Sequence, residues 1–272
     1  MNAVSAQNFS PLEGRNPEMA TTLYEAHEIV SIHRALGGGE FDAAIADRIR
    51  RISDGPISYT AEKATSSSNA ARNFAFELLV AERLVSGGSK PLFPHYADVG
   101  ALASNMQLAI QCKRVWSSDE QAIGRNFRNA EKDLKPAKKV GARGIVALDI
   151  SRALNPDFTI PRLADQAAIR DALVGVLEDF IDDNAQMLRD AKAKTIGLLT
   201  RVSMMVEQVE PRSSYMYCQQ YALTPVPSVS ASERQALDEF GVVLQAAASG
   251  DRDRFTLMSN PAPSASMSDP ET

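Results

Sequence analysis

The amino-acid sequence predicts an α/β fold, with a central mixed β-sheet flanked by helices and a helical addition at the N-terminus. Short runs with strand character alternate along the chain with longer runs of helical periodicity. One of these runs, Gly144–Ile150 (GIVALDI), is apolar enough to be a buried strand. We expect the two leading helical runs to be an addition to the α/β unit rather than a separate large domain.

The chain has 272 residues and a net charge of −5, which allows a sizeable core but gives no overall basic surface. Binding to a polyanion would therefore need a local basic patch. Cys112 and Cys218 lack the spacing of a zinc site, and a reduced, cytoplasmic protein is the expectation. The N-terminus lacks the features of a signal peptide, and no apolar run approaches about 18 to 20 residues, so we expect no membrane span.

Glycine, proline and polar residues divide the chain into four parts. We expect a flexible N-terminal tail at residues 1–18, an N-terminal helical element at 19–68, an α/β domain at 69–250 and a flexible C-terminal tail at 251–272. Within the N-terminal element, three consecutive glycines separate two predicted helices, at Thr21–Leu36 and Glu40–Ile52.

A helix predicted at Ala70–Val85 begins the α/β domain, after a polar loop at Thr65–Asn69 in which Ser68 or Asn69 can cap it. Pro136 should kink or end a later helix near Lys135. The remaining elements are strands at Pro91–Phe93, Tyr96–Val99 and Gln107–Val115, a helix at 118–135, a strand at Gly144–Ile150, a helix at Asp165–Lys192, strands at Thr195–Val206 and Tyr215–Leu223, and a helix at Ala231–Ala248.

Polar residues interrupt the apolar run at Gln107–Val115. Because alternate residues of a strand share a face, Gln111 and Lys113 should lie side by side. If Asp98 lies on the neighbouring strand, its carboxylate can meet Gln111 across the pair of strands. Carboxylate and amide oxygens are ligands that Mg²⁺ accepts, and Lys113 could orient the attacking water or neutralise charge on a phosphate. The alternative is a turn aspartate beside the solvated face of an edge strand.

Asp98, the step of thirteen residues to Gln111, and the triplet of Gln111, Cys112 and Lys113 resemble the PD-(D/E)XK nuclease superfamily. Glu77, on the helix before them, resembles the additional acidic ligand of its Holliday-junction-resolvase and Mrr-like restriction branches. The resemblance covers about a third of the chain and implies a restriction-endonuclease-like core.

This resemblance implies hydrolysis of phosphodiester bonds, usually in DNA, with Mg²⁺ or Mn²⁺ as cofactor. It assigns Asp98 and Gln111 to metal binding, Lys113 to catalysis, and Glu77 to metal binding or water positioning. A homodimer is a further expectation from the resemblance.

The chain departs from the family pattern at two positions. Ala97 stands where a proline usually precedes the aspartate, and Gln111 stands where the triplet usually has a glutamate. Gln-x-Lys is an accepted variant in the Mrr-like branch, but it leaves the site with less negative charge. Glu77 then becomes more important for metal binding, or the protein is weakly active or inactive. The alternative interpretation of Glu77 is an ordinary residue on a helix surface.

A basic stripe follows the triplet. Arg125, Arg128, Lys132 and Lys135 recur at three or four residues, opposite an apolar stripe on the same predicted helix. We expect them, with Arg114, to contact the nucleic-acid backbone. The alternative is a solvated helix face in which acidic residues are interspersed.

Three functions remain open at this point. The first is a divalent-metal-dependent nuclease that acts on DNA, in defence, restriction or repair. The second is a nuclease-like fold with a decayed site that binds nucleic acid or a protein partner without cleavage. The third is an α/β interaction protein, and failure to bind DNA at low salt would favour it.

Overall fold

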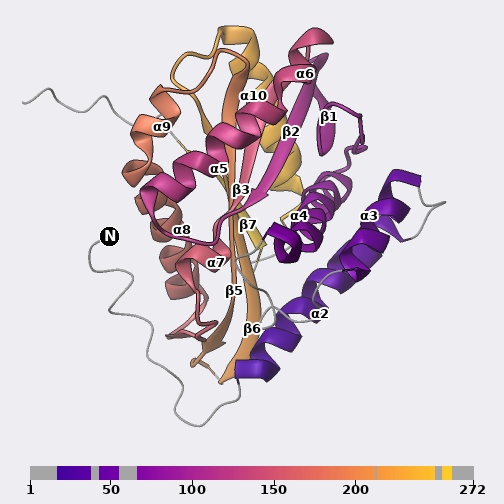
Figure 1. Cartoon of the computed structure of the whole chain (residues 1–272). Helices are drawn as coiled ribbons and strands as arrows, with labels where there is room; N and C mark the ends of the chain where they lie inside the picture. The colour runs from indigo at the N-terminus through magenta and orange to yellow at the C-terminus, as the bar shows by residue number, and fades with distance from the viewer. Residues whose placement is uncertain (1–16, 38–42, 55–65, 212, 249–252, 259–272) are drawn as a thin grey trace, which may run out of the picture.

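The computed structural model describes residues 17–37, 43–54, 66–211, 213–248 and 253–258. In this part of the chain, seven strands form one mixed sheet flanked by helices, which confirms the predicted α/β class (Figure 1). The strands are β1 (Val99–Ala103), β2 (Met106–Arg114), β3 (Arg143–Asp149), β4 (Arg162–Leu163), β5 (Thr195–Gln208), β6 (Ser214–Pro225) and β7 (Asp253–Leu257). The helices are α2 (Pro17–Leu36), α3 (Ala43–Ser53), α4 (Ser66–Ser86), α5 (Glu120–Asp133), α6 (Lys135–Lys139), α7 (Ser151–Leu154), α8 (Gln166–Asp183), α9 (Ala185–Arg189) and α10 (Ala231–Ala246).

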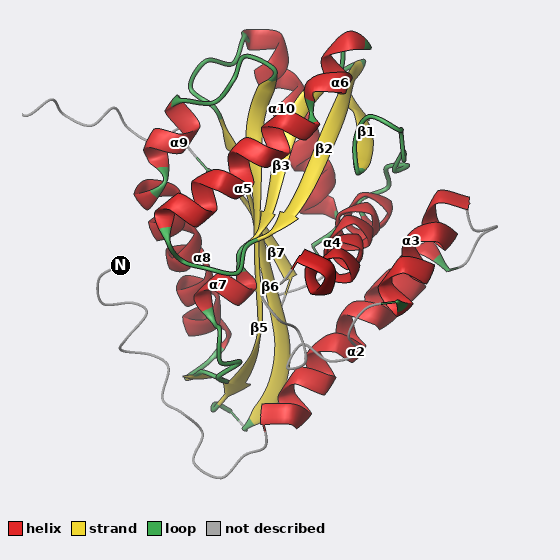
Figure 2. Cartoon of the chain, viewed as in Figure 1, coloured by secondary structure: helices red, strands yellow, loops and turns green. Residues whose placement is uncertain are grey.

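The strands are ordered β1-β2-β3-β5-β6-β7, and β4 pairs with β5 beside this path. The pairs β1–β2 and β5–β6 are antiparallel, whereas β2–β3, β3–β5, β4–β5 and β6–β7 are parallel. Parallel neighbours need crossover connections. Helices α5 and α6 connect β2 to β3 along the chain. The connection from β3 to β5 contains α7, α8 and α9 (Figure 2).

Apolar side chains on the two faces of the sheet form separate cores. Phe127 of α5 and Leu177 of α8 belong to the core on one face. Leu78 of α4 and Phe240 of α10 belong to the core on the other face. Helices α2 and α3 contact α4, and α2 also reaches β5 and β6, so the N-terminal helices extend the second layer.

The strand predicted at Tyr96–Val99 was placed too early. β1 begins at Val99 and forms a tight hairpin with β2 through Ser104 and Asn105, whose φ angles are 46° and 60°. Asparagine tolerates this left-handed conformation, which two-residue hairpin loops require. Strand Pro91–Phe93 was also wrong, because only Leu92 forms a bridge there, with Gly100.

Several helix boundaries differ from the predictions. α4 begins at Ser66, so residues 66–69 of the predicted loop are helical. The predicted break at Pro136 is confirmed, since α5 ends at Asp133 and Pro136 lies in the first turn of α6. The helix predicted at Asp165–Lys192 is two helices, because the Asn184 side chain bonds to the Phe180 carbonyl oxygen and ends α8.

The C-terminal segment also differs from the prediction. β7 lies inside residues 251–272, which we expected to be a flexible tail, and pairs in parallel with β6. Met258, after β7, is buried in the core on the α5 face. Residues 1–16 and 259–272 of the predicted tails lie outside the described residues, as do the start of the predicted helix at Glu40 and the turn residues from Gly55. The last two residues of the predicted N-terminal tail, Pro17 and Glu18, belong to α2.

A capping box of Ser230 and Glu233 begins α10 and stabilises its first turn. The Glu233 carboxylate accepts from the Ser230 backbone N–H at 2.8 Å, and the Glu233 N–H donates to Ser230 Oγ at 3.3 Å. We expect Ser230→Ala to lower the free energy of unfolding by about 1 kcal/mol, measured by urea denaturation. Ser228→Ala, an exposed control two residues earlier, should change it by less than about 0.5 kcal/mol. Equal effects of the two substitutions would contradict a role for the box.

Candidate metal centre

Asp98 lies directly before β1 and meets β2 as expected. Val99 pairs with Ile110, and extending this register by one residue places Asp98 opposite Gln111. Asp98 Oδ2 accepts a hydrogen bond from the Cys112 backbone N–H at 2.8 Å, and the Gln111 side chain also bonds to the Asp98 carboxylate. The hairpin of β1 and β2 therefore fixes these two oxygen-bearing side chains beside each other.

Glu77 approaches the same point from α4. Its residue is only 4 % exposed, and its carboxylate accepts from Arg48 Nε at 2.6 Å. Burial and the nearby Asp98 charge raise the pKa of Glu77 to about 8, against the opposing effects of Arg48 and Lys113. Burial likewise raises the pKa of Asp98. Two carboxylates close together, one buried and one half-buried, are costly when both are ionised unless cations neutralise them, and a metal site has this property.

Lys113 follows Gln111 on the same face of β2. Its ammonium lies 2.8 Å from Asp133 Oδ2 at the end of α5, and it lowers the pKa of both Glu77 and Asp98. The structure thus brings together all four predicted residues, Glu77, Asp98, Gln111 and Lys113. Asp133, which sequence analysis left on a solvated helix face, is an additional neighbour.

Asp98 and Gln111 line an open cleft of about 730 Å³. One wall comes from α3 and includes Arg48 and Arg51. The opposite wall comes from the junction of α5 and α6. The remaining lining residues are Asp47, Phe74, Phe93, Pro94, His95, Tyr96, Ala97, Lys132, Asp133, Lys135 and Pro136. The acidic centre is therefore reached between two walls that both carry positive charge.

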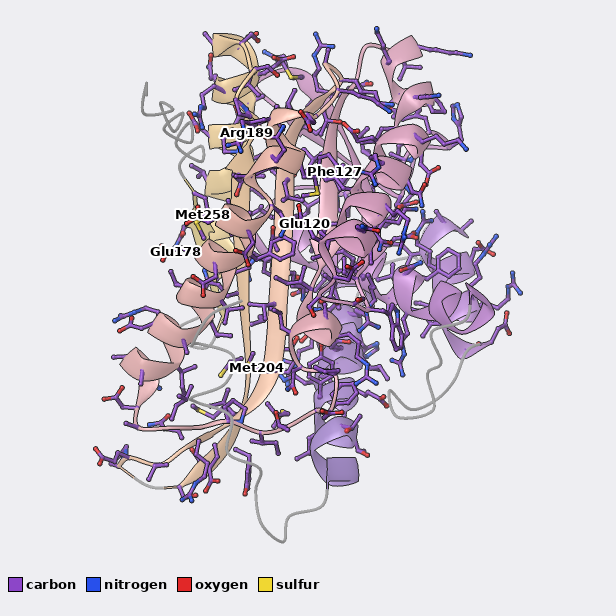
Figure 3. The ribbon with its side chains drawn as sticks, turned by 60° about the vertical axis from the view of Figure 1, so that its left-hand side comes forward. Glu120, Phe127, Glu178, Arg189, Met204 and Met258 are labelled. Carbon is purple, nitrogen blue, oxygen red and sulfur yellow. The ribbon has the colours of Figure 1, made fainter. Side chains whose placement is uncertain are left out.

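The predicted basic stripe is exposed along α5 and the first residue of α6. Its members Arg125, Arg128, Lys132 and Lys135 all face solvent, whereas Phe127, labelled in Figure 3, is buried against the sheet. The apolar stripe was predicted as Ile123, Phe127, Ala130 and Leu134, and all four are buried. One interspersed acid is also buried: Glu131 accepts from the Lys192 backbone N–H and Thr195 Oγ1, at 2.7 and 2.9 Å.

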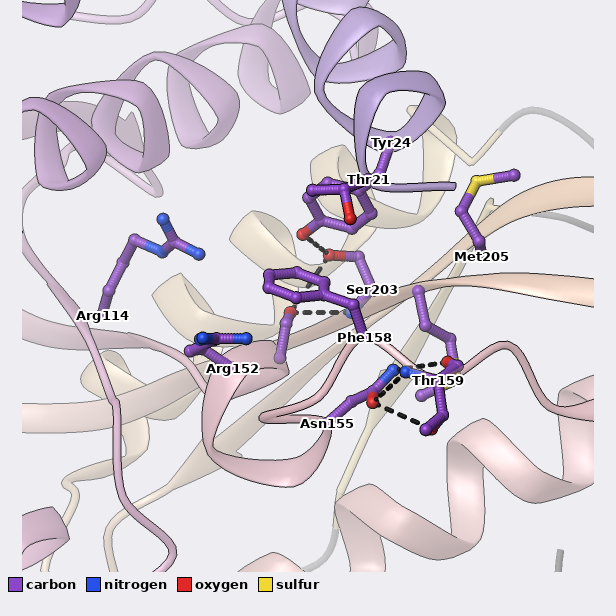
Figure 4. A pocket seen from close by; sticks show the side chains of 11 residues that line it. Thr21, Tyr24, Arg114, Arg152, Asn155, Phe158, Thr159, Ser203 and Met205 are labelled. Carbon is purple, nitrogen blue, oxygen red and sulfur yellow. Dashed lines mark hydrogen bonds between the residues drawn. The ribbon is translucent and has the colours of Figure 1, made fainter. Parts of the chain in front are cut away.

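Arg114 does not lie with this stripe. Strand alternation turns it away from Lys113, and its side chain is 3 % exposed, 3.3 Å from Asp149 Oδ2. It lines a small cavity with Tyr24 and Ser203 (Figure 4). A cavity of about 20 Å³ holds no more than a water molecule. The Arg114 side chain is therefore enclosed in the protein and separate from the basic stripe, and its contact with nucleic acid stays a prediction.

Arg48 is the site residue that sequence analysis missed. It lies 29 residues before Glu77, on a helix whose apolar stripe of Ile45, Ile49 and Ile52 indicated only packing. A run of three arginines in IADRIRRIS was the available signal, but nothing in the spacing indicated which of them faces the centre.

The donor set fits a hard divalent cation. Glu77 and Asp98 offer carboxylates and Gln111 offers an amide oxygen, while Mg²⁺ in proteins takes one or two carboxylates and retains several waters. Within the described ranges, no group of three or more His, Cys, Asp and Glu side chains is arranged to hold a metal ion. The candidate centre is therefore a set of two carboxylates that depends on Gln111 as a third ligand.

Comparisons with protein-family models, curated proteins and solved structures found no match for this chain. The interpretation of the centre therefore depends on its geometry and on the short motif that predicted it. None of the helices in the described part of the chain is long and apolar enough to span a membrane.

Proposed function

We propose that this chain is a Mg²⁺- or Mn²⁺-dependent nuclease that hydrolyses DNA phosphodiester bonds, with a site like that of the PD-(D/E)XK nucleases. The convergence of Glu77, Asp98, Gln111 and Lys113 supports this proposal, and two of them, Asp98 and Gln111, line a cleft with basic walls. The four residues of the predicted motif lie near one another in the fold, although they come from α4, β2 and the segment before β1.

In the proposed reaction, Glu77, Asp98 and Gln111 would hold the divalent ion, which when bound would supply a more acidic water and a polarised phosphoryl oxygen. Lys113 beside them offsets the negative charge that develops on the phosphate. Asp133 holds the Lys113 ammonium in place through their 2.8 Å ion pair. Glu77 is buried, which shields its carboxylate from bulk water and strengthens its interactions, whereas the half-buried Asp98 lines the cleft.

A second function is a binding module with a decayed site, and two observations favour it. Gln111 supplies no charge where the family usually has a glutamate. Arg48 already forms an ion pair with Glu77, so the centre has a cation of its own. A protein of this kind would bind DNA without a metal and leave it intact.

A cleavage assay tests the proposed function. Purified protein is incubated with supercoiled plasmid, linear duplex and branched DNA in Mg²⁺, Mn²⁺ or EDTA. Cleavage that requires the metal supports the nuclease. Intact DNA with metal-independent binding by the folded protein would favour the binding module, and absence of binding at low salt would favour a protein-interaction role.

The basic wall of the cleft supports a prediction about affinity. We expect Lys132→Ala/Lys135→Ala to weaken binding to DNA of any sequence and to reduce the slope of log K against log salt by about 2, because each phosphate contact contributes about 0.9. Binding would be measured by fluorescence anisotropy over a salt series. Arg170→Ala/Arg189→Ala removes the same charge from α8 and α9 and should leave the slope nearly unchanged. Equal changes in both double variants would mean that the wall formed by α5 and α6 has no special role in binding DNA.

A further inference from the structure

Arg48 ties the N-terminal helical element to the candidate metal centre. Its guanidinium donates to Glu77 Oε2 at 2.6 Å, to the Asp98 carbonyl oxygen at 2.8 Å and to the Ala44 carbonyl oxygen at 3.2 Å. The guanidinium carbon lies 4.5 Å from the centroid of the Phe93 ring. Four separate contacts fix one surface-helix arginine in a single position.

The charges of the centre explain why this position is favourable. When both are ionised, Glu77 and Asp98 place two negative charges close together, and the positive charges of Arg48 and Lys113 oppose them. Arg48 contacts both acidic residues of the candidate centre, since it donates to the Glu77 carboxylate and to the backbone carbonyl of Asp98. A divalent ion bound by Glu77 and Asp98 would therefore stand close to the guanidinium, and like charges at such a distance repel strongly.

We propose that Arg48 competes with the divalent ion for Glu77, so that α3 sets the metal affinity of the centre. The inference rests on the proposed function, because it concerns the same candidate ligands. When the ion binds, the guanidinium leaves Glu77 and turns toward the cleft, which Arg48 already lines together with Arg51. There its planar set of donors is suited to a phosphate group, so the arginine released by the metal can bind the substrate backbone.

Calorimetric titration with Mg²⁺ and Mn²⁺ at a fixed pH tests this competition. Arg48→Met keeps the apolar stem that packs near Phe93 but removes the charge, and we expect it to bind metal at least about tenfold more tightly than the wild type. Arg48→Lys keeps the charge and should bind metal as the wild type does. Arg51→Met is the matched control, since Arg51 lies on the same helix and cleft wall but pairs with Asp47 instead of Glu77.

A second measurement needs no substitution at Arg48. Metal binding should release α3 and increase the hydrogen exchange of its backbone amides several-fold in the wild type, with no such change in Asp98→Ala. Metal binding without a change in α3 exchange, or without tighter binding by folded Arg48→Met, would overturn the inference and leave the proposed function standing. Absence of metal binding by the wild type and by every Arg48 variant would overturn both.

Discussion

Asp98→Asn is expected to reduce metal-dependent DNA cleavage by about 10³-fold or more while the protein remains folded. Asp98 supplies one of only two carboxylates in the candidate centre, and direct ligands of a catalytic metal contribute several kcal/mol of transition-state stabilisation. The asparagine oxygen can still accept the 2.8 Å hydrogen bond from the Cys112 N–H, so the hairpin keeps its contact with the segment before β1. The substitution thus removes charge from the centre with little change in shape.

Single-turnover cleavage of plasmid DNA measures this effect, and urea denaturation of the same samples reports the fold. Asp47→Asn is the matched control, because Asp47 also lines the cleft but pairs with Arg50 and Arg51 on the exposed face of α3. We expect the control to cleave within about twofold of the wild type, as for a residue that touches neither metal nor phosphate. Full activity of folded Asp98→Asn would exclude this centre as the site of cleavage.

The class of the fold could be predicted because its long elements have clear periodicity. Strands such as Thr195–Gln208 carry enough apolar residues to be recognised without knowledge of their partners. The short strands could not be predicted in the same way. β7 contains only five residues and is stabilised by parallel pairing with β6, a contact that local sequence does not encode. The hairpin of β1 and β2 depends on left-handed backbone at Ser104 and Asn105, which a Ser-Asn pair only weakly indicates.

The part of the candidate site that lies within one hairpin could be predicted, because the spacing of its residues along the chain determines which of them meet. Asp98 and Gln111 meet because a two-residue turn and strand pairing bring them into register. Arg48 and Asp133 could not be predicted, because they reach the centre from helices whose packing is fixed by distant contacts. Arg114 is a different case: the alternation that placed Lys113 on the cleft side also places Arg114 on the opposite side, so the sequence contained the information that excludes it from the basic patch.

Arg201→Met is expected to lower the free energy of unfolding by about 3 to 5 kcal/mol at neutral pH. The Arg201 side chain is fully buried and donates to Asp149 Oδ2 at 3.0 Å and to Glu28 Oε1 at 2.7 Å. Methionine fills much of the same space but leaves the two carboxylates buried without this cation. Glu28 lies on α2, so the loss should also weaken the attachment of the N-terminal helices to β3 and β5.

The destabilisation should depend on pH in a defined direction. Burial alone would raise the pKa of Asp149, but Arg201, Arg114 and the bonds from Ser151 hold it below its ordinary value. The ionised carboxylate therefore contributes stability above the pKa of about 3.9 found in unfolded chains, and this contribution is lost as the pH falls through the folded-state pKa. In Arg201→Met the buried carboxylate lacks its main cation, so its protonation on acidification relieves the destabilisation. The difference between wild type and variant should shrink between pH 7 and pH 4.

Urea denaturation at pH 7 and pH 4 measures both parts of this expectation. Arg170→Met is the control, because the Arg170–Asp171 ion pair is exposed and such pairs contribute about 0 to 1 kcal/mol. A loss below about 1 kcal/mol in Arg201→Met, or a loss that grows as the pH falls, would contradict a network held together by the ionised Asp149. The network of Arg201, Asp149 and Glu28 holds α2, whereas Arg48 holds α3. If these two attachments act independently, a variant that weakens only the Arg201 network should bind metal with the affinity of the wild type.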